Sequence, residues 1–341
     1  MNNIIKTLFA DKNGNIVFKN VEDKNTKKGF IKIRSKVSLI SPGTEMHYRK
    51  KACIDSNDTV LGYCLCGVVV DVGEGVKGFS INDRVIAMGL NYAFHAEQVM
   101  VPYRLCVKIP DDMRFDKAVF SNLLATSVHA VDRANIGENK NILVVGAGLV
   151  GQLTAAYLSA NHNIMIADLV SERLNIAKKN NIKTVNTGDS DWKETVKKNT
   201  DNKGVDAVYI CCSGEISNLM TDIFELFSNN YDGIKKGKII FIGRCSANIN
   251  FNVTLGNIDI INSARCGLGY KDYDFEVGNK DYPESIDQPT VSDNLRRSVE
   301  YIKNIDTDVL ITDRYHFDDA ADAYSSIENG KSSIGILIEY N

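Results

Sequence analysis

The chain has 341 residues, of which 44% are hydrophobic and 24% are charged. This composition is typical of a globular protein of about two domains and excludes wholesale disorder. The 40 basic and 43 acidic residues give a net charge of −3, which argues against a protein that binds nucleic acid or an anionic membrane.

The first 120 residues predict the short strands of a mainly antiparallel β domain. An Asn13-Gly14 pair, which favours a hairpin turn, separates expected strands at 8–10 and 16–18. The further expected strands are at 30–34, 67–73, 84–88 and 98–101.

From about residue 115 onward, strands alternate with longer helical segments, a pattern typical of βαβ units. The expected strands are 141–145, 163–167, 207–211 and 238–242, and the expected helices are 149–159, 171–179, 192–198 and 216–227. The alternation then ends. A long polar loop at 271–292, which is a candidate functional loop, precedes helices at about 294–303 and 318–328 and a strand at 334–339.

The cysteines and the N-terminus indicate a cellular compartment. The eight cysteines contain no Cys-x-x-Cys pair, and several lie in apolar runs, as Cys211 and Cys212 do. We therefore expect reduced, buried thiols in a cytoplasmic protein. The N-terminus has no basic start followed by an apolar stretch and predicts no signal peptide. The uncharged stretch 142–160 is interpreted as strand, turn and helix because it contains three glycines.

A glycine-rich turn supplies the first functional motif. The segment from Gly146 to Gly151 fits G-x-G-x-x-G, and it joins an expected strand to an expected helix. The first glycine permits a tight turn, Gly148 lets the backbone approach a pyrophosphate, and the third lets helix and strand pack closely. The predicted phosphate-binding residues are Gly146, Ala147, Gly148, Leu149, Val150 and Gly151, at the positive end of the helix dipole.

Asp168 ends the next strand, about 20 residues further on, where this motif places an acid. Its carboxylate can accept hydrogen bonds from the adenosine ribose hydroxyls and would repel a 2′-phosphate. The sequence therefore predicts binding of NAD(H) in preference to NADP(H). The alternative is a doubly wound domain with an empty or different nucleotide pocket.

Further motifs, in this order, resemble a known superfamily. The quoted segments are 37–45, similar to G-I-C-G-T-D; 62–69, similar to G-H-E-x-x-G-x-V; 82–85, similar to G-D-R-V; 96–102; and 108–111. Together with the βαβ segment they resemble the medium-chain dehydrogenase/reductases, the alcohol-dehydrogenase-like enzymes. The resemblance implies an α/β fold in which a Rossmann domain, a doubly wound parallel sheet at 123–268, is inserted into a mainly-β GroES-like catalytic domain formed by 1–122 and 269–341.

The positions that bind zinc in this superfamily hold other residues here. Pro42 replaces a cysteine, Tyr63 replaces a histidine, and Asn122 stands at the third ligand position. Proline cannot ligate, and a neutral phenol or carboxamide is a poor zinc ligand. No cysteines for a structural zinc lie between Met88 and Val101, so we expect neither zinc. The segment 41–45 resembles an S-x-G-T-E subgroup that lacks the zinc ligands and is associated with sugar or polysaccharide biosynthesis.

The resemblance also implies roles for single residues. Thr44 matches a position whose hydroxyl touches the substrate oxygen, and His47 matches one that passes a proton toward solvent. Tyr63 could also direct its hydroxyl at that oxygen, whereas Glu45 could orient His47 or be structural. Arg173, Thr126 and Ser213 are further expected cofactor contacts, and the expected substrate contacts are His95, Asn122, Tyr270 and Arg244. The alternative for the histidines and Tyr63 is an ordinary surface or core role.

These observations predict a zinc-independent, NAD(H)-dependent oxidoreductase. It would transfer hydride between nicotinamide and an alcohol or carbonyl group of a polar small molecule, a sugar or polyol derivative. Two alternatives are an NAD(P)H-dependent quinone or enoyl reductase and a catalytically silent dinucleotide-binding sensor or structural protein. No nucleic-acid or membrane partner is expected. The resemblance implies a homodimer or homotetramer, with 258–263 as the candidate edge strand.

Overall fold

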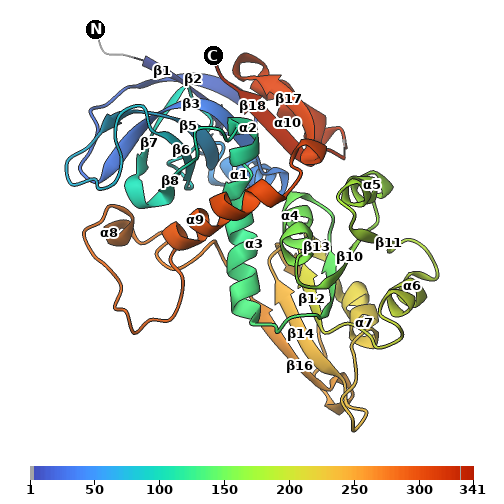
Figure 1. Ribbon diagram of the computed structural model, residues 1–341. Coiled ribbons are helices and arrows are strands. Elements are labelled where there is room, and N and C mark those ends of the chain that lie inside the picture. Colours follow the sequence, from blue (N-terminus) through green and yellow to red (C-terminus); the bar gives the residue numbers. More distant parts are fainter. Residues whose placement is uncertain (1–3, 331) are drawn as a thin grey trace. The chain divides into compact units, whose positions relative to one another are not determined.

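The computed structural model describes residues 4–330 and 332–341, and the chain divides into two compact units (Figure 1). Unit 1 comprises residues 1–125 and 266–341, and unit 2 comprises residues 126–265. The chain thus leaves unit 1 once and returns to it, close to the expected boundaries at 122 and 268.

Unit 2 is built on a six-stranded sheet in which all strands are parallel. Its strands are β9 (Asn141–Val145), β10 (Asn163–Asp168), β11 (Lys183–Asn186), β12 (Ala207–Ile210), β14 (Lys236–Phe241) and β16 (Asn257–Asn262). They are ordered β11-β10-β9-β12-β14-β16. Counted along the chain this is 3-2-1-4-5-6, the order of the doubly wound dinucleotide-binding fold. Two short strands, β13 (Gly214–Glu215) and β15 (Cys245–Ser246), pair separately.

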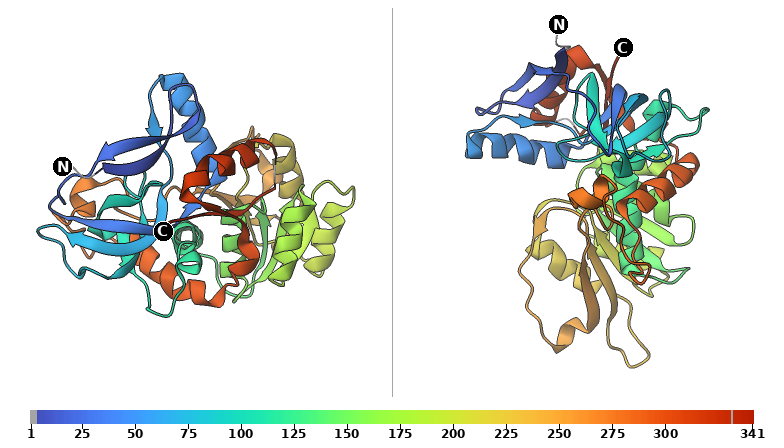
Figure 2. Two further views of the ribbon diagram at one scale, coloured as in Figure 1. Left: turned by 90° about the horizontal axis from the view of Figure 1, so that it is seen from above. Right: turned by 90° about the vertical axis from the view of Figure 1, so that its left-hand side faces the viewer.

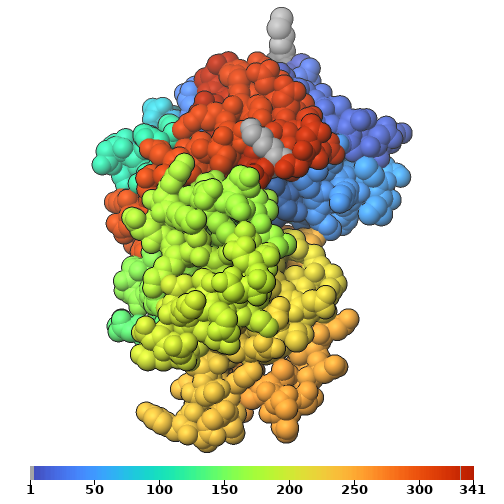
Figure 3. Space-filling view, turned by 90° about the vertical axis from the view of Figure 1, so that its right-hand side faces the viewer, coloured from blue at the N-terminus to red at the C-terminus, as the bar shows by residue number. Residues whose placement is uncertain are grey.

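Helices cover both faces of this sheet because successive side chains of a strand point to opposite faces. On β9, Ile142 and Val144 pack with α3, α4 and α5, whereas Leu143 and Val145 pack with α6 and α7. These helices are α3 (Ser121–Ala134), α4 (Leu149–Leu158), α5 (Ser171–Lys179), α6 (Trp192–Asn199) and α7 (Ser217–Glu225). In Figure 3 the green to yellow segment that contains α5 and α6 makes up much of the visible surface of this unit.

Unit 1 is mainly antiparallel β structure. A seven-stranded sheet runs β17-β18-β3-β5-β6-β8, with β7 also paired to β3, and a three-stranded sheet runs β2-β1-β4. The strands are β1 (Ile4–Ala10), β2 (Ile16–Glu22), β3 (Phe30–Ile40), β4 (Thr59–Val60), β5 (Cys64–Val72), β6 (Arg84–Met88), β7 (Gln98–Pro102), β8 (Cys106–Lys108), β17 (Ile311–His316) and β18 (Gly335–Glu339). Its helices are α1 (Pro42–Asp55), α2 (Phe115–Ala118), α8 (Tyr273–Glu276), α9 (Val291–Tyr301) and α10 (Ala320–Glu328). Short 3-10 turns complete the unit: Tyr103–Leu105, Ile302–Asn304, Asp308–Leu310 and Phe317–Asp319.

The C-terminal segment completes the core of unit 1. Strand β18 pairs antiparallel with β3, with Ile336 opposite Ile40 and Ile338 opposite Ser38. In both views of Figure 2 the red C-terminal segment lies beside the blue N-terminal strands. Leu8, Ile40, Tyr324 and Ile338 are wholly or almost wholly buried together. A chain that ended before residue 266 would leave this apolar face uncovered.

The mixed α/β fold, with a parallel sheet inserted in a mainly-β domain, confirms the predicted fold class. The structure differs from the prediction at helix α1 and at strands β11 and β17, which the sequence pattern did not reveal. The polar loop 271–292 contains the short helix α8. In the described part of the chain, no helix has both the length and the apolar composition that crossing a bilayer requires.

Candidate active site

The glycine-rich turn of unit 2 has the geometry that its motif requires. Gly146, directly after β9, has a φ of +99°, and a Cβ atom there would lie 2.7 Å from the backbone nitrogen of Cys212. At Gly151 a Cβ atom would lie 1.8 Å from the carbonyl oxygen of Gly146. Both positions therefore exclude a side chain, the first by conformation and contact and the second by contact with the turn.

Gly148 differs from these two glycines because nothing lies within 4 Å of a Cβ atom placed on it. It is the N-cap residue of α4, with extended backbone angles and no side chain to cap the helix. The first N–H groups of the helix, beginning at Leu149 and Val150, face outward from this cap. An open glycine at a ten-residue helix N-terminus is the cradle that a pyrophosphate needs.

Asp168 stands at the carboxyl end of β10, beside this turn. Its Oδ2 accepts the N–H of Ala147 at 2.6 Å, and its Oδ1 accepts the N–H of Val170 at 2.8 Å. Each carboxylate oxygen has further lone pairs for ribose hydroxyls. Arg173 Nη1 lies 4.0 Å from Oδ2, so the predicted pair of Asp168 and Arg173 is brought together.

The other predicted residues of unit 2 lie at its edges. Thr126 is half-buried on α3, and Ser213 is exposed just after β12. Arg244 is exposed just after β14, the neighbouring strand. Because β12 and β14 are parallel, Ser213 and Arg244 share the edge of the sheet at which ligands of such folds bind.

A cluster of hydroxyl groups forms a separate candidate site, in unit 1. Ser41 occupies the N-cap position of α1 but its side chain makes no capping bond to the helix, and Thr44 lies in the first turn. The hydroxyl groups of both form hydrogen bonds with the phenol of Tyr63. Burial, followed by the nearby Cys64 thiol, raises the pKa of Tyr63 well above its usual value near 10, although the two hydroxyls act in the opposite direction. The phenol therefore stays protonated at neutral pH and can donate to an oxygen.

Glu45 holds this helix start in place. Its carboxylate is 1% exposed, and Oε1 accepts the backbone N–H of Ser41 at 2.7 Å. Oε2 lies 3.0 Å from Nε2 of His95 and accepts the hydroxyl hydrogen of Tyr324 on α10. The carboxylate thus ties the α1 start to two distant segments of unit 1.

For Glu45 these contacts agree with the structural role that the sequence left open. The arrangement corrects two other expectations. His95 is 0% exposed, and its Nδ1 lies 2.7 Å from the Ser38 hydroxyl, so its ring has a structural role and no nitrogen left for a substrate. Asn122 is also 0% exposed and donates from Nδ2 to the carbonyl of Leu65 at 3.3 Å, which takes the place of the expected donation to substrate.

His47 lies one turn further along α1 and is half-buried, with its ring 5.6 Å from that of Tyr48. In residues 4–330 and 332–341, the side chains of His, Cys, Asp and Glu make no group of three or more that could hold a metal ion. Tyr63 is held by hydroxyl groups and Asn122 by a backbone carbonyl, so neither position presents a good zinc donor.

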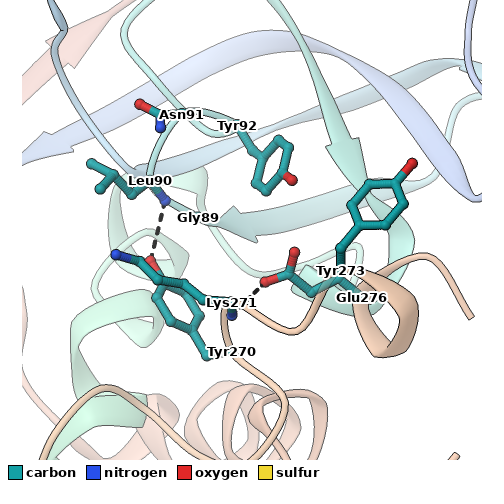
Figure 4. Close-up of a pocket in the computed structure, with 8 residues that line it drawn as sticks. All are labelled: Gly89, Leu90, Asn91, Tyr92, Tyr270, Lys271, Tyr273 and Glu276. Carbon is teal, nitrogen blue, oxygen red and sulfur yellow. Dashed lines mark hydrogen bonds between the residues drawn. The ribbon is translucent and has the colours of Figure 1, made fainter. Parts of the chain in front are cut away.

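A cavity of about 370 Å³ opens next to this cluster in unit 1 (Figure 4). It is joined to Tyr63 through the backbone, because the N–H of Gly89 donates to the Tyr63 carbonyl at 3.0 Å. Two segments far apart in sequence form its walls, and the lining residues are Gly89, Leu90, Asn91, Tyr92, Tyr270, Lys271, Tyr273 and Glu276. The predicted Tyr270 lines this cavity, and its hydroxyl oxygen accepts the N–H of Leu90 at 3.1 Å.

Sequence reasoning did not single out Tyr92, Tyr273 or Glu276 as site residues. The signal available was indirect: Tyr92 follows the expected strand 84–88, and the other two lie in the polar loop expected to be functional. Asn91 and Lys271 both line the cavity and have left-handed φ values of +68° and +69°. Non-glycine residues adopt this conformation rarely, and they do so disproportionately at ligand-binding sites.

The fold and the nucleotide cradle define a dehydrogenase-like protein, in which a Rossmann unit is inserted into a second domain. Residues 27–111 match the alcohol dehydrogenase GroES-like domain. D-Xylulose reductase of Scheffersomyces stipitis is 25% identical over 87% of this chain and 88% of its own length. L-Idonate 5-dehydrogenase of Vitis vinifera is 28% identical over 53% of this chain. These matches support the resemblance of the chain to the medium-chain dehydrogenase/reductase superfamily.

Solved structures share the fold of the whole chain. An Escherichia coli oxidoreductase of unknown specificity, involved in membrane biogenesis, superposes with a TM-score of 0.80 at 18% identity, covering 99% of this chain and 100% of the other. An alcohol dehydrogenase of E. coli in complex with NADH superposes with a TM-score of 0.76 at 19% identity, covering 98% of this chain and 99% of the other. A dehydrogenase of Sinorhizobium meliloti bound to NADP superposes with a TM-score of 0.76 at 18% identity, covering 99% of each chain. The alignments with the first curated relatives span only 38% to 60% of those proteins.

Proposed function

We propose that this protein is a zinc-independent, NAD(H)-dependent oxidoreductase that acts on an alcohol or carbonyl group of a sugar or polyol derivative. The observation that carries the proposal is the open cradle at Gly148 beside the Asp168 carboxylate. The substrate class is supported by relatives named for xylulose, idonate and sorbitol. Those names belong to the relatives, so the substrate of this chain needs a direct test.

The residues of unit 2 fit a dinucleotide. The N–H groups at the start of α4 would bind the pyrophosphate, and Asp168 would accept hydrogen bonds from the adenosine ribose. A 2′-phosphate would place its negative charge against this carboxylate, so NAD(H) is favoured over NADP(H). Arg173, 4.0 Å from the carboxylate, would help to fix its orientation.

The bound nicotinamide supplies or accepts the hydride. The oxygen of the substrate then needs a proton donor in the reducing direction, and Tyr63 provides a phenol that remains protonated at neutral pH. Thr44 and Ser41 hold this phenol by hydrogen bonds, and Glu45 holds the backbone that carries them. We assign proton exchange with solvent to His47, as the only half-buried histidine within the first two turns of α1.

Hydrogen-bond donors would replace a Lewis acid in this reaction. The side chains at the zinc-ligand positions are a phenol, a proline and a carboxamide, and none is a strong zinc ligand. Metal analysis of the purified protein tests this directly. One tightly held zinc ion per chain, required for activity, would contradict the proposal.

The central experiment measures cofactor affinity and turnover together. We expect NADH to bind at least tenfold more tightly than NADPH. Asp168→Asn should reduce the ratio of the two affinities at least tenfold. Asp189→Ala, at an exposed position, is the control. Turnover is measured with a panel of sugars, polyols and the corresponding ketones, and Tyr63→Phe is expected to lower kcat by about 100-fold or more. NADPH preference with quinone turnover would support a reductase instead, and tight NADH binding without any turnover would support a silent sensor.

The edge strand β16 supports assembly into a homodimer or homotetramer. Within the described part of the chain it pairs only with β14, and Ile260 on it is 39% exposed. An edge strand with exposed apolar side chains can pair with another copy. Light scattering of the purified protein measures its molar mass in solution. We expect the mass of a dimer or tetramer for the parent protein and a shift toward the mass of the monomer for Ile260→Lys.

A further inference from the structure

A buried amide side chain of unit 2 lies behind the nucleotide turn and has no part in the contacts proposed for the cofactor. Gln152 follows Gly151 directly on α4 and is 1% exposed. Its Nε2 donates to the carbonyl of Ala147 at 3.2 Å and to the carbonyl of Arg173 at 2.9 Å. An amide nitrogen carries two hydrogens, so this side chain joins the backbones of two separate segments.

The two segments that Gln152 joins are also the segments that hold Asp168. The N–H of Ala147 donates to Asp168 Oδ2 at 2.6 Å, and Arg173 Nη1 lies 4.0 Å from the same oxygen. Oδ1 of this carboxylate accepts the N–H of Val170, the N-cap residue of α5, at 2.8 Å. Gln152 closes these contacts into a ring that connects the nucleotide turn, the end of β10 and the first turn of α5.

The orientation of the Gln152 amide is fixed by its neighbours. Reversing the amide would place Oε1 against two carbonyl oxygens, which repel it. In the orientation observed, Oε1 is buried and forms no hydrogen bond with the described residues. An unpaired buried acceptor costs free energy, and an apolar side chain of similar size would avoid this cost. Packing alone therefore gives no reason for an amide at this position, whereas its two donated hydrogen bonds do.

We propose that Gln152 is a positioning residue for cofactor selection, which holds Asp168 in the orientation that accepts the adenosine ribose and repels a 2′-phosphate. The inference rests on the proposed function in taking Asp168 as the residue that selects NAD(H). A binding group discriminates well only while it stays within about 0.5 Å of its productive position. Without the amide, the turn and α5 lose their connection through α4, and the carboxylate gains freedom to turn away from the ribose.

Gln152→Met tests this role, because methionine is similar to glutamine in length and volume but donates no hydrogen bond. Titration of the full-length protein measures the dissociation constants of NADH and NADPH. We expect the ratio of the NADPH constant to the NADH constant to fall by about fivefold or more. A residue that only braces α4 would weaken the binding of both nucleotides by the same factor. An unchanged ratio in Gln152→Met would therefore overturn the inference.

A double-substitution cycle asks whether Gln152 acts through Asp168. In an Asp168→Asn background, Gln152→Met should change the ratio by less than about twofold, because the charge that discriminates is already absent. A further large fall in that background would contradict the positioning role. Asn199→Leu is the matched control, because it removes another amide of unit 2 that donates to a backbone carbonyl, that of Thr195. This control should keep the ratio of the parent protein.

Hydrogen exchange provides a measurement that needs no cofactor. The Ala147 amide is bonded to Asp168, so in nucleotide-free Gln152→Met it should exchange about tenfold faster or more, while amides of β9 keep their protection. Trp192 fluorescence shows whether unit 2 of each variant is folded. If Gln152→Met does not fold, Gln152→Asn replaces it, since the shorter amide cannot reach both carbonyls. Parental protection of the Ala147 amide in the folded variant would refute the inference.

Binding and turnover distinguish this inference from the proposed function. A preference for NADH and a turnover that both persist in Gln152→Met would leave the oxidoreductase intact and remove the positioning role. A preference that depends on Gln152, in a protein that turns over no alcohol or ketone, would keep the positioning role and remove the oxidoreductase. A parent protein that binds NADPH as tightly as NADH would remove both the positioning role and the proposed NAD(H) selectivity.

Discussion

The buried carboxylate of Glu45 gives a prediction with a magnitude that follows from its contacts. Its two oxygens take the N–H of Ser41, the ring of His95 and the hydroxyl of Tyr324. Glu45→Gln puts an amide group there, which cannot accept at its nitrogen. One or two fully buried donors then lose their partner, which should cost about 3 to 5 kcal/mol of the free energy of unfolding.

A smaller perturbation tests the same network. Tyr324→Phe removes one hydroxyl group and leaves the ring, which is 0% exposed, in place. The loss of one hydrogen bond to a charged acceptor should cost about 1.5 to 3 kcal/mol. Tyr231→Phe is the control because Tyr231 is fully exposed in unit 2.

Chemical denaturation followed by circular dichroism measures these differences. The single tryptophan, Trp192, lies in unit 2, so its fluorescence follows the unit that the substitutions do not touch. Hydrogen exchange adds a local measurement, and amides of α1 should exchange faster in both variants while those of β9 and β10 remain protected. If the free energies of unfolding of Glu45→Gln and Tyr324→Phe both lie within 0.5 kcal/mol of that of the parent protein, the carboxylate does not hold the start of α1 in place.

Two further predictions concern the nucleotide turn and a surface ion network. Gly148→Ala should leave the melting temperature unchanged, because nothing lies within 4 Å of the added carbon, but should weaken NADH binding tenfold or more. Gly151→Ala should instead lower the free energy of unfolding of unit 2 by about 3 kcal/mol, because its added carbon meets the Gly146 carbonyl. Calorimetry measures the stability of both variants and titration measures their NADH affinity. Equal effects of the two substitutions in both measurements would contradict this distinction. Burial raises the pKa of Asp116, but hydrogen bonds from Arg114 and Arg314 outweigh it and hold this pKa below the usual value of 3.8. A lowered folded-state pKa contributes stability that is present above the unfolded pKa and lost as the pH falls through the folded value. Asp116→Asn should therefore lower the free energy of unfolding by about 1 kcal/mol at neutral pH and by progressively less below about pH 4. Chemical denaturation at several pH values measures this difference. Asp112→Asn, at an exposed position, is the control and should show neither effect.

Much of unit 2 was predictable because its signals are local. The apolar runs of β9 and β10 and the helices between them follow from short-range patterns. The glycines at 146, 148 and 151 reflect requirements of a single turn, and the acid at the end of the next strand follows at a fixed spacing. The preference for right-handed crossovers then reduces the number of possible strand orders.

Helix α1 and strands β11 and β17 were harder to predict. The segment 42–55 begins with Pro42 and has few apolar positions, so its pattern does not indicate an amphipathic helix. Strands β11 and β17 have mixed burial, and each is recognisable mainly through its partner strand. For these elements, pairing and packing outweigh local preference.

The residue types of the site could be read from the sequence, but their contacts could not. Glu45, His95 and Tyr324 come from three segments separated by tens to hundreds of residues, and no local pattern says that one carboxylate will satisfy the other two. The cavity of Tyr92 and Glu276 arises in the same way from two distant loops. Local sequence thus determined the nucleotide turn, because backbone geometry within a few residues fixes it. Only the tertiary structure decided which buried groups meet, because burial forces each polar group to find a partner wherever the folded chain provides one.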